Sequence, residues 1–329
     1  MRRGLRPLIR AVGAPVAGVA VTILRCSKRA AGVAVLYHST AQPVRDPELE
    51  IVPPHPPRLF AAQLRHLRRW YRVVDAADLL EAISERRRFG RFPVAITFDD
   101  DLPEHVTVAL PILERNGLQA TFFLCGKSLD APFSFWWERL QRAMDVDGRR
   151  AVELVAARSP ERVTTDSAVH ELAQAIEDLT PTQRAVLADD LGALVGPDPE
   201  DAGLRASGVQ RLARAGMTIG FHTMHHDPLD SLDHEELSRA LRNGRDRLAA
   251  VAGSDPAVIA YPHGRTNLAV AEAARSAGFR IGFSAAGLPA RPDDHPLLIP
   301  RITPSYRSVG HFAAQLVLCL RSASRRTMP

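Results

Sequence analysis

The chain has 329 residues, 46% hydrophobic and 24% charged, so it can bury a sizeable core as one large or two modest domains. Its net charge is +5, but aromatic residues make up only 6%, which leaves few stacking surfaces for nucleic acid. Cys26, Cys125 and Cys319 are far apart and form no CxxC pair, which argues against a disulfide framework or a thiolate zinc site and fits a reducing compartment.

Residues 1–31 form a basic, partly apolar segment. Its apolar stretch, residues 11–24, has fourteen residues, whereas a helix that crosses a bilayer needs about 20. We therefore predict a peripheral membrane contact, with a solvated tail and an uncleaved signal anchor as alternatives. Gly13, Pro15 and Gly18 argue against a regular helix. Residues 321–329 are a basic tail, and the expected location is cytoplasmic or membrane-associated.

From residue 32 onwards, short apolar runs alternate with amphipathic segments. The runs predict strands at 32–37, 71–74, 93–98, 120–125, 217–221, 258–261, 279–284 and 297–299. The amphipathic segments predict helices at 60–71, 76–86, 104–116, 208–216, 233–252, 268–277 and 309–320. Gly117 is expected to end the third helix, and Asp233 with Glu236 has the form of a capping box. About seven strand-loop-helix units predict a parallel (β/α) barrel.

Residues 136–207 interrupt this alternation with helical patterns alone, which predicts an inserted helical subdomain. Trp136 and Trp137 open it and have two interpretations. Their aromatic faces could wall a sugar subsite, or they could pack in the core, which is the commoner role of paired tryptophans at the start of a helix.

Three carboxylates, Asp99, Asp100 and Asp101, end the apolar run 93–98. Consecutive like charges repel, and removing them from water is costly unless a cation compensates. The carboxyl ends of parallel strands are, however, where α/β folds build their sites. The triplet therefore predicts either a functional site or an acidic, solvated turn.

A second polar group, His222-Thr-Met-His225-His226, ends the run 217–221. A helical turn after this strand would place His222 and His226 on one side, where their two nitrogens can hold one divalent ion. Together with Asp100 they would leave coordination positions open for water, as catalytic metal sites do. The alternative is a chance HxxxH pair on a surface helix.

The ordered motifs TFDD, HTMHH with its trailing Asp-Pro-Leu, and AYPHG resemble the first three motifs of the polysaccharide deacetylases, the NodB-homology carbohydrate esterases. The resemblance covers residues 32–302 and implies a distorted (β/α) barrel, here assigned to residues 32–320, that removes acetyl groups from N-acetylated sugars with a metal ion. It implies that Asp99 is the general base. It also implies that Asp100, His222 and His226 bind one divalent ion, with zinc the expected metal.

Three departures from the family pattern concern the catalytic groups. Asp101 stands where the family usually has Gly, and is expected to accept left-handed geometry there. Ala260 replaces an Arg that often orients the base, and Leu298–Ile302 lacks the usual His acid. Because an acid should titrate near neutral pH at the same rim, His38 is the preferred replacement, with His263 the next candidate.

These observations predict a deacetylase that hydrolyses an N-acetyl or O-acetyl group of an amino sugar, polysaccharide or glycoconjugate. A backbone N–H near Tyr261 is expected to hold the developing oxyanion, with Pro262 and His263 in the same loop. As a neighbour of Asp100 on a strand, Asp99 is expected to point to the opposite side. Two alternatives are a catalytically weak carbohydrate-binding or scaffold protein on this fold and a metal hydrolase of a small amide.

Overall fold

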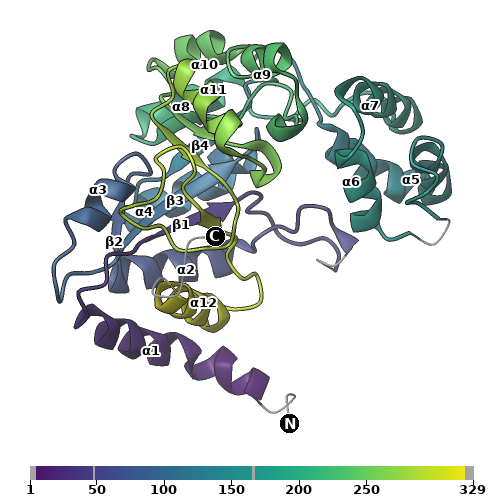
Figure 1. Cartoon of the computed structure of the whole chain (residues 1–329). Coiled ribbons are helices and arrows are strands. Elements are labelled where there is room, and N and C mark those ends of the chain that lie inside the picture. The colour runs from purple at the N-terminus through teal and green to yellow at the C-terminus, as the bar shows by residue number, and fades with distance from the viewer. Residues whose placement is uncertain (1–4, 47–48, 165–166, 323–329) are drawn as a thin grey trace.

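A twisted sheet of parallel strands forms the centre of the molecule (Figure 1). The computed structural model describes residues 5–46, 49–164 and 167–322, and the side chains of the first helix from Gly13 onwards. The strands are β1 Val33–Tyr37, β2 Arg72–Val74, β3 Pro93–Asp99, β4 Thr121–Leu124, β5 Thr218–Phe221, β6 Val258–Ala260, β7 Ile281–Phe283 and β8 Arg301–Ile302. Their order is β7-β6-β5-β4-β3-β1-β8, and β2 also pairs with β3.

The sheet curls almost into a closed barrel, which confirms the predicted (β/α) barrel and its distortion. All seven pairings between strands are parallel. β8 pairs with β1 at one edge, and a parallel bridge from Phe283 in β7 to Ile299 brings the segment before β8 to the other edge. Because every strand runs the same way, all their carboxyl ends lie at one rim.

Helices cover the outside of the sheet (Figure 1). They are α2 Pro57–Trp70, α3 Leu79–Ser84, α4 Leu110–Asn116, α8 Ala206–Arg214, α9 His234–Ala240, α10 Arg245–Ala252, α11 Leu268–Ser276 and α12 Val309–Ser322. Helix α1, Leu5–Arg25, lies outside them and packs against α12 and α2. A π-helical stretch, His105–Ala109, leads into α4. Gly117 ends α4 in the left-handed conformation, as predicted.

Three predictions of local structure were wrong. The strand expected at 297–299 is instead β8 at Arg301–Ile302, and Ile299 makes only an isolated bridge to Phe283. The helix expected over 233–252 is two helices, because Gly244 adopts a φ of 81° between α9 and α10; the capping box of Asp233 and Glu236 is present. Residues 5–25 form a helix despite Pro15. Its glycines allow close packing instead: a Cβ on Gly13 would lie 3.0 Å from the Cα of Gly310 in α12.

Three further helices, α5 Trp136–Ala156, α6 Val169–Glu177 and α7 Pro181–Val195, stand beside the barrel (Figure 1). They have their own apolar core, which includes Leu140, Val155, Leu172 and Leu191. α5 is kinked at Asp147, whose φ of −151° is not helical. Across the described residues, no helix has both the length and the apolar character needed to cross a membrane.

Candidate active site

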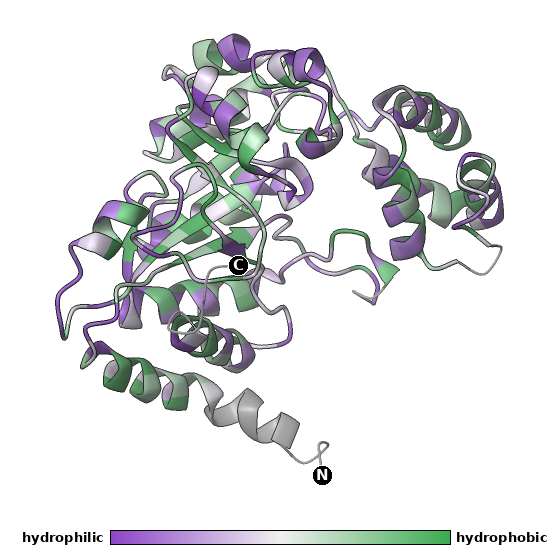
Figure 2. Ribbon diagram, in the orientation of Figure 1, coloured by the Kyte–Doolittle hydropathy of each residue, from purple (hydrophilic) through white to green (hydrophobic). Residues whose placement is uncertain are grey.

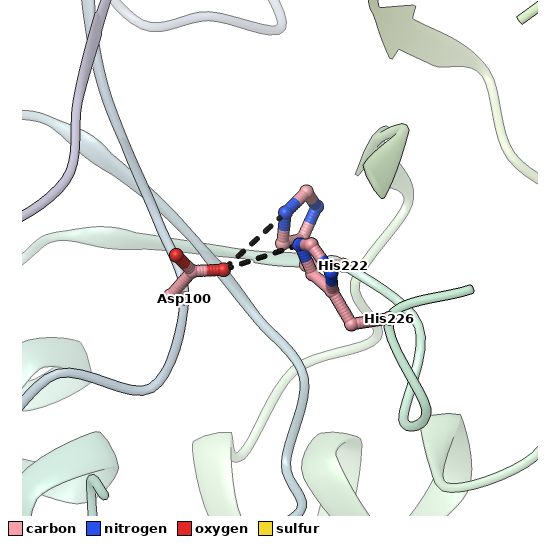
Figure 3. A group of neighbouring side chains, drawn as sticks. All are labelled: Asp100, His222 and His226. Carbon is pink, nitrogen blue, oxygen red and sulfur yellow. Dashed lines mark ion pairs between the residues drawn. The ribbon is translucent and has the colours of Figure 1, made fainter. Parts of the chain in front are cut away.

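Asp100, His222 and His226 meet at the carboxyl-terminal rim of the sheet (Figure 3). Oδ1 of Asp100 lies 3.6 Å from Nε2 of His222 and 3.4 Å from Nε2 of His226. The three potential ligand atoms all lie within 4.8 Å of one another, and all three residues are buried. The residue directly after β3 supplies the carboxylate, and the loop after β5 supplies both imidazoles.

Strained backbone, rather than a helical turn, brings the two histidines together. Thr223 has a φ of 57° and His226 a φ of 53°, so the chain after β5 doubles back instead of starting a helix. Asp100 itself has a φ of 73°, so the left-handed position that was expected at Asp101 lies one residue earlier. Non-glycine residues in this region cost about 1–3 kcal/mol each, and such strain concentrates at functional sites.

The donor atoms suit a divalent cation. Oδ1 of Asp100 is buried without a hydrogen-bond partner in the described part of the chain. Burial and the adjacent charge of Asp99 raise the pKa of Asp100 well above its usual value, which a cation would reverse. Burial lowers the pKa of both histidines, which keeps them neutral as ligation requires. Nδ1 of His222 lies 2.8 Å from the Ala260 carbonyl, which as an acceptor leaves Nε2 free to bind metal.

Asp99 forms a buried bidentate ion pair with Arg301 of β8, a residue that the sequence analysis missed. The guanidinium donates to Oδ1 at 2.6 Å and to Oδ2 at 2.7 Å, and the Arg301 side chain is 0% exposed. Burial alone would raise the pKa of Asp99, but Arg301 and His222 reverse this effect and lower it. Arg301 therefore orients Asp99, which is the role expected of the Arg that Ala260 replaces. A lone arginine within the apolar run 297–302 was the available signal.

Asp99 also faces the metal ligands, contrary to the expectation that it points away. Its Oδ2 lies 3.7 Å from Nε2 of His222, nearly as close as Oδ1 of Asp100. The left-handed turn at Asp100 breaks the strand alternation on which that expectation rested. Both carboxylates therefore border one cavity.

The cavity has a volume of about 350 Å³. Residues from the sheet rim and from the inserted helices line it together: His38, Asp99, Asp100, Trp136, Trp137, Glu177, His222, His226 and His263.

Comparison with known proteins agrees with this arrangement. The family model for polysaccharide deacetylase matches residues 86–282, more than half of the chain. The chain belongs to the polysaccharide deacetylase family. This family comprises hydrolases that act on acyl groups of carbohydrates, so the protein is a carbohydrate deacetylase.

Solved structures share the fold of this deacetylase at low sequence identity. The Streptococcus pyogenes deacetylase PplD is 17% identical with a TM-score of 0.58, and the match covers 88% of this chain and 99% of that one. IcaB from Ammonifex degensii is 18% identical with a TM-score of 0.57, covering 87% and 97%. The polysaccharide deacetylase BC0361 from Bacillus cereus is 14% identical with a TM-score of 0.56, covering 87% and 69%. A search of curated proteins found no match.

The inserted helices of the deacetylase complete its active-site cavity. The ring of Trp137 lies 4.5 Å from that of His226, measured between centroids. Glu177, at the end of α6, places Oε1 3.1 Å from Nδ1 of His263. In α7 the buried Arg184 pairs with Asp227, next to His226, at 3.0 Å. Glu177 was not predicted, because its helix is remote in sequence from every motif.

The other predicted residues fall into two groups. His38 and His263 line the cavity. The backbone N–H of Tyr261 donates to the Phe283 carbonyl at 3.0 Å, so this N–H is not available to an oxyanion. An oxyanion donor elsewhere near Tyr261 stays a prediction. Pro262 is buried in the turn after β6 and has no N–H to offer.

Asp101 and His225 lie outside the metal cluster. The Asp101 carboxylate accepts backbone N–H bonds from Cys125 at 2.8 Å and Lys127 at 3.0 Å, which anchors the loop after β4. Its charge is therefore satisfied by protein donors rather than by the metal site. His225 is exposed and contacts Asn243, as expected of a residue that points away.

Replacing His226 by Ala should abolish metal binding, because it removes one of three ligands from a buried site. His225→Ala is the matched control and should retain the metal of the unaltered protein. Elemental analysis of the purified proteins measures both. Equal metal content in the two variants would overturn the ligand assignment.

Arg301→Gln should destabilise the fold by about 3–5 kcal/mol, because it leaves the Asp99 carboxylate buried and unpaired. Arg301→Lys keeps the charge but not the fork of two donors, so its loss should be smaller. Urea unfolding measures both, and exposed Arg307→Gln is the control. If Arg301→Gln and the control Arg307→Gln unfolded at the same urea midpoint, the ion pair would contribute nothing to stability.

Proposed function

We propose that this deacetylase hydrolyses the N-acetyl group of an amino sugar, or of a polymer or glycoconjugate that contains one, with a single zinc ion. The observation that carries the proposal is an ionised carboxylate, Asp99, held by Arg301 beside the Asp100, His222 and His226 cluster. A hydrolase of this type needs a base next to its metal-binding groups, and the cavity provides both within one wall.

Asp100, His222 and His226 would hold the ion, with coordination positions left for water and substrate. A zinc ion bound there would polarise the acetyl carbonyl and lower the pKa of water from 15.7 to about 7. Asp99 accepts the proton of the attacking water. Arg301 keeps this carboxylate ionised and fixed in orientation through two hydrogen bonds.

Proton delivery to the leaving amine is assigned to His263 rather than to His38. Burial lowers the pKa of His38 to about 4, so its imidazole is neutral at neutral pH. A general acid was expected to titrate near neutral pH, which His38 does not do. His263 has a carboxylate partner in Glu177 at 3.1 Å, the arrangement that orients a histidine for proton transfer. His38 instead offers the substrate a neutral hydrogen-bonding group.

The two tryptophans shape the cavity mainly as packed walls. Trp137 stacks on Phe135 with a centroid distance of 4.4 Å, and Trp136 packs edge-on against Trp137. Each is only 7% exposed, so both belong largely to the core, as their commoner role predicts. Both residues also line the cavity, where they would limit the size of the sugar that enters.

Acetate release from N-acetylglucosamine oligomers, with and without chelator, tests this function. Asp99→Asn should retain metal but lose about 10²–10⁴-fold in turnover, because it removes the base. Asp100→Asn should lose both metal and activity. A metal-loaded protein that releases no acetate from any N-acetylated or O-acetylated sugar would favour a binding or scaffold role.

His38→Ala should lower turnover without changing the shape of the pH–rate profile around neutrality. A group with a pKa of about 4 is already neutral there, and its contribution persists as pH rises. His263→Ala should lower turnover further, since it removes the proton donor. Loss of the alkaline limb of the profile in His38→Ala would return the acid role to that residue.

A further inference from the structure

Charge is strongly segregated along this chain. All 37 Asp and Glu residues lie within residues 46–294. Residues 1–45 contain eight Lys or Arg residues, residues 295–329 contain five, and neither segment contains an acidic residue. The two basic segments meet in the fold, because α1 packs along α12 and Arg29 donates to the carbonyl of Leu320 at 2.7 Å.

Helix α1 exposes one apolar face to solvent. Ala17 and Val21 lie on the buried face of α1. On the opposite side Val16, Val19 and Ile23 are 61%, 58% and 66% exposed. Figure 2 shows the described part of this helix as predominantly hydrophobic. Since residues 11–24 contain no charged residue, the exposed face is apolar along its described length.

The loop between α3 and β3 extends this face with an aromatic side chain surrounded by arginines. Phe89 is 64% exposed and has a φ of 70°, an unfavourable conformation for a bulky residue. Its N–H donates to the Arg25 carbonyl at 2.7 Å, which fixes the loop to the end of α1. The basic apolar face comprises Val16, Val19, Ile23, Lys28, Arg87, Arg88, Phe89 and Arg91, all of them exposed.

We propose that the basic apolar face docks on the surface of an anionic lipid bilayer. Aliphatic side chains and Phe89 would enter the interface while the arginines contact lipid phosphates, as in amphipathic segments that lie in the membrane plane. A second copy of the chain fits this face less well, because self-association would bring its uncompensated positive charges together. A spanning role is not supported, since α1 falls short of the required apolar length.

Flotation with vesicles tests the proposal on the full chain without substrate, so the result does not depend on the proposed reaction. The protein should bind vesicles that contain about one quarter phosphatidylglycerol far better than pure phosphatidylcholine, and salt should weaken binding. The double variant Val19→Glu with Ile23→Glu should reduce partitioning at least about tenfold. Leu268→Glu, on an equally exposed leucine (66%) of α11, should not.

A second pair of variants isolates the electrostatic part. Lys28→Gln with Arg87→Gln should weaken binding to anionic vesicles about fivefold for each charge removed. Arg211→Gln with Arg280→Gln removes two exposed charges elsewhere and should have no effect. Unchanged vesicle binding in Val19→Glu with Ile23→Glu would overturn the proposal. The proposal would also be overturned if the unaltered protein bound no vesicles but formed a dimer in light scattering, and if Val19→Glu with Ile23→Glu made that dimer dissociate.

Discussion

The buried ion pair between Asp99 and Arg301 links the proposed catalytic base to closure of the barrel. Asp99 ends β3 and Arg301 begins β8, and both strands flank β1. Arg301 also donates to the hydroxyl of Thr97 in β3 and to the carbonyl of Ser284 after β7, so one guanidinium connects two parts of the barrel wall to β8. Burying either charge without its partner would be costly, so the pairing of β8 with β1 favours formation of the ion pair between Arg301 and Asp99. The same ion pair fixes the proposed base, Asp99, next to the candidate metal ligands.

Strain and desolvation collect around the same cavity. Three non-glycine residues that line it, Asp100, His226 and His263, have positive φ values. Asp100 brings a carboxylate to a buried position where its charged form is disfavoured. A bound cation would relieve that penalty, so metal binding would offset the cost in stability of burying these groups.

The inserted helices act as a second wall rather than a remote module. They meet the metal-binding loop through Trp137 and Arg184, and they bring Glu177 to His263. A cavity built from two separately packed cores can change its lining through the inserted helices while the barrel keeps its metal ligands. The basic apolar face involves α1 and the α3–β3 loop, neither of which lines the cavity, so the proposed surface binding and the proposed reaction would use separate parts of the chain.

Much of this architecture was readable in the sequence, because its signals are local. Apolar runs that end in Asp99-Asp100 and in His222 predicted both the parallel strands and the rim where they meet, and ordered motifs predicted the metal ligands. Interactions between distant segments were not readable. Arg301 pairs with Asp99 across 202 positions of the chain. Glu177 reaches His263 from a helix that carries no motif. The left-handed turn that points Asp99 and Asp100 into one cavity, and the low pKa of His38, depend on burial and packing that arise only when the barrel closes.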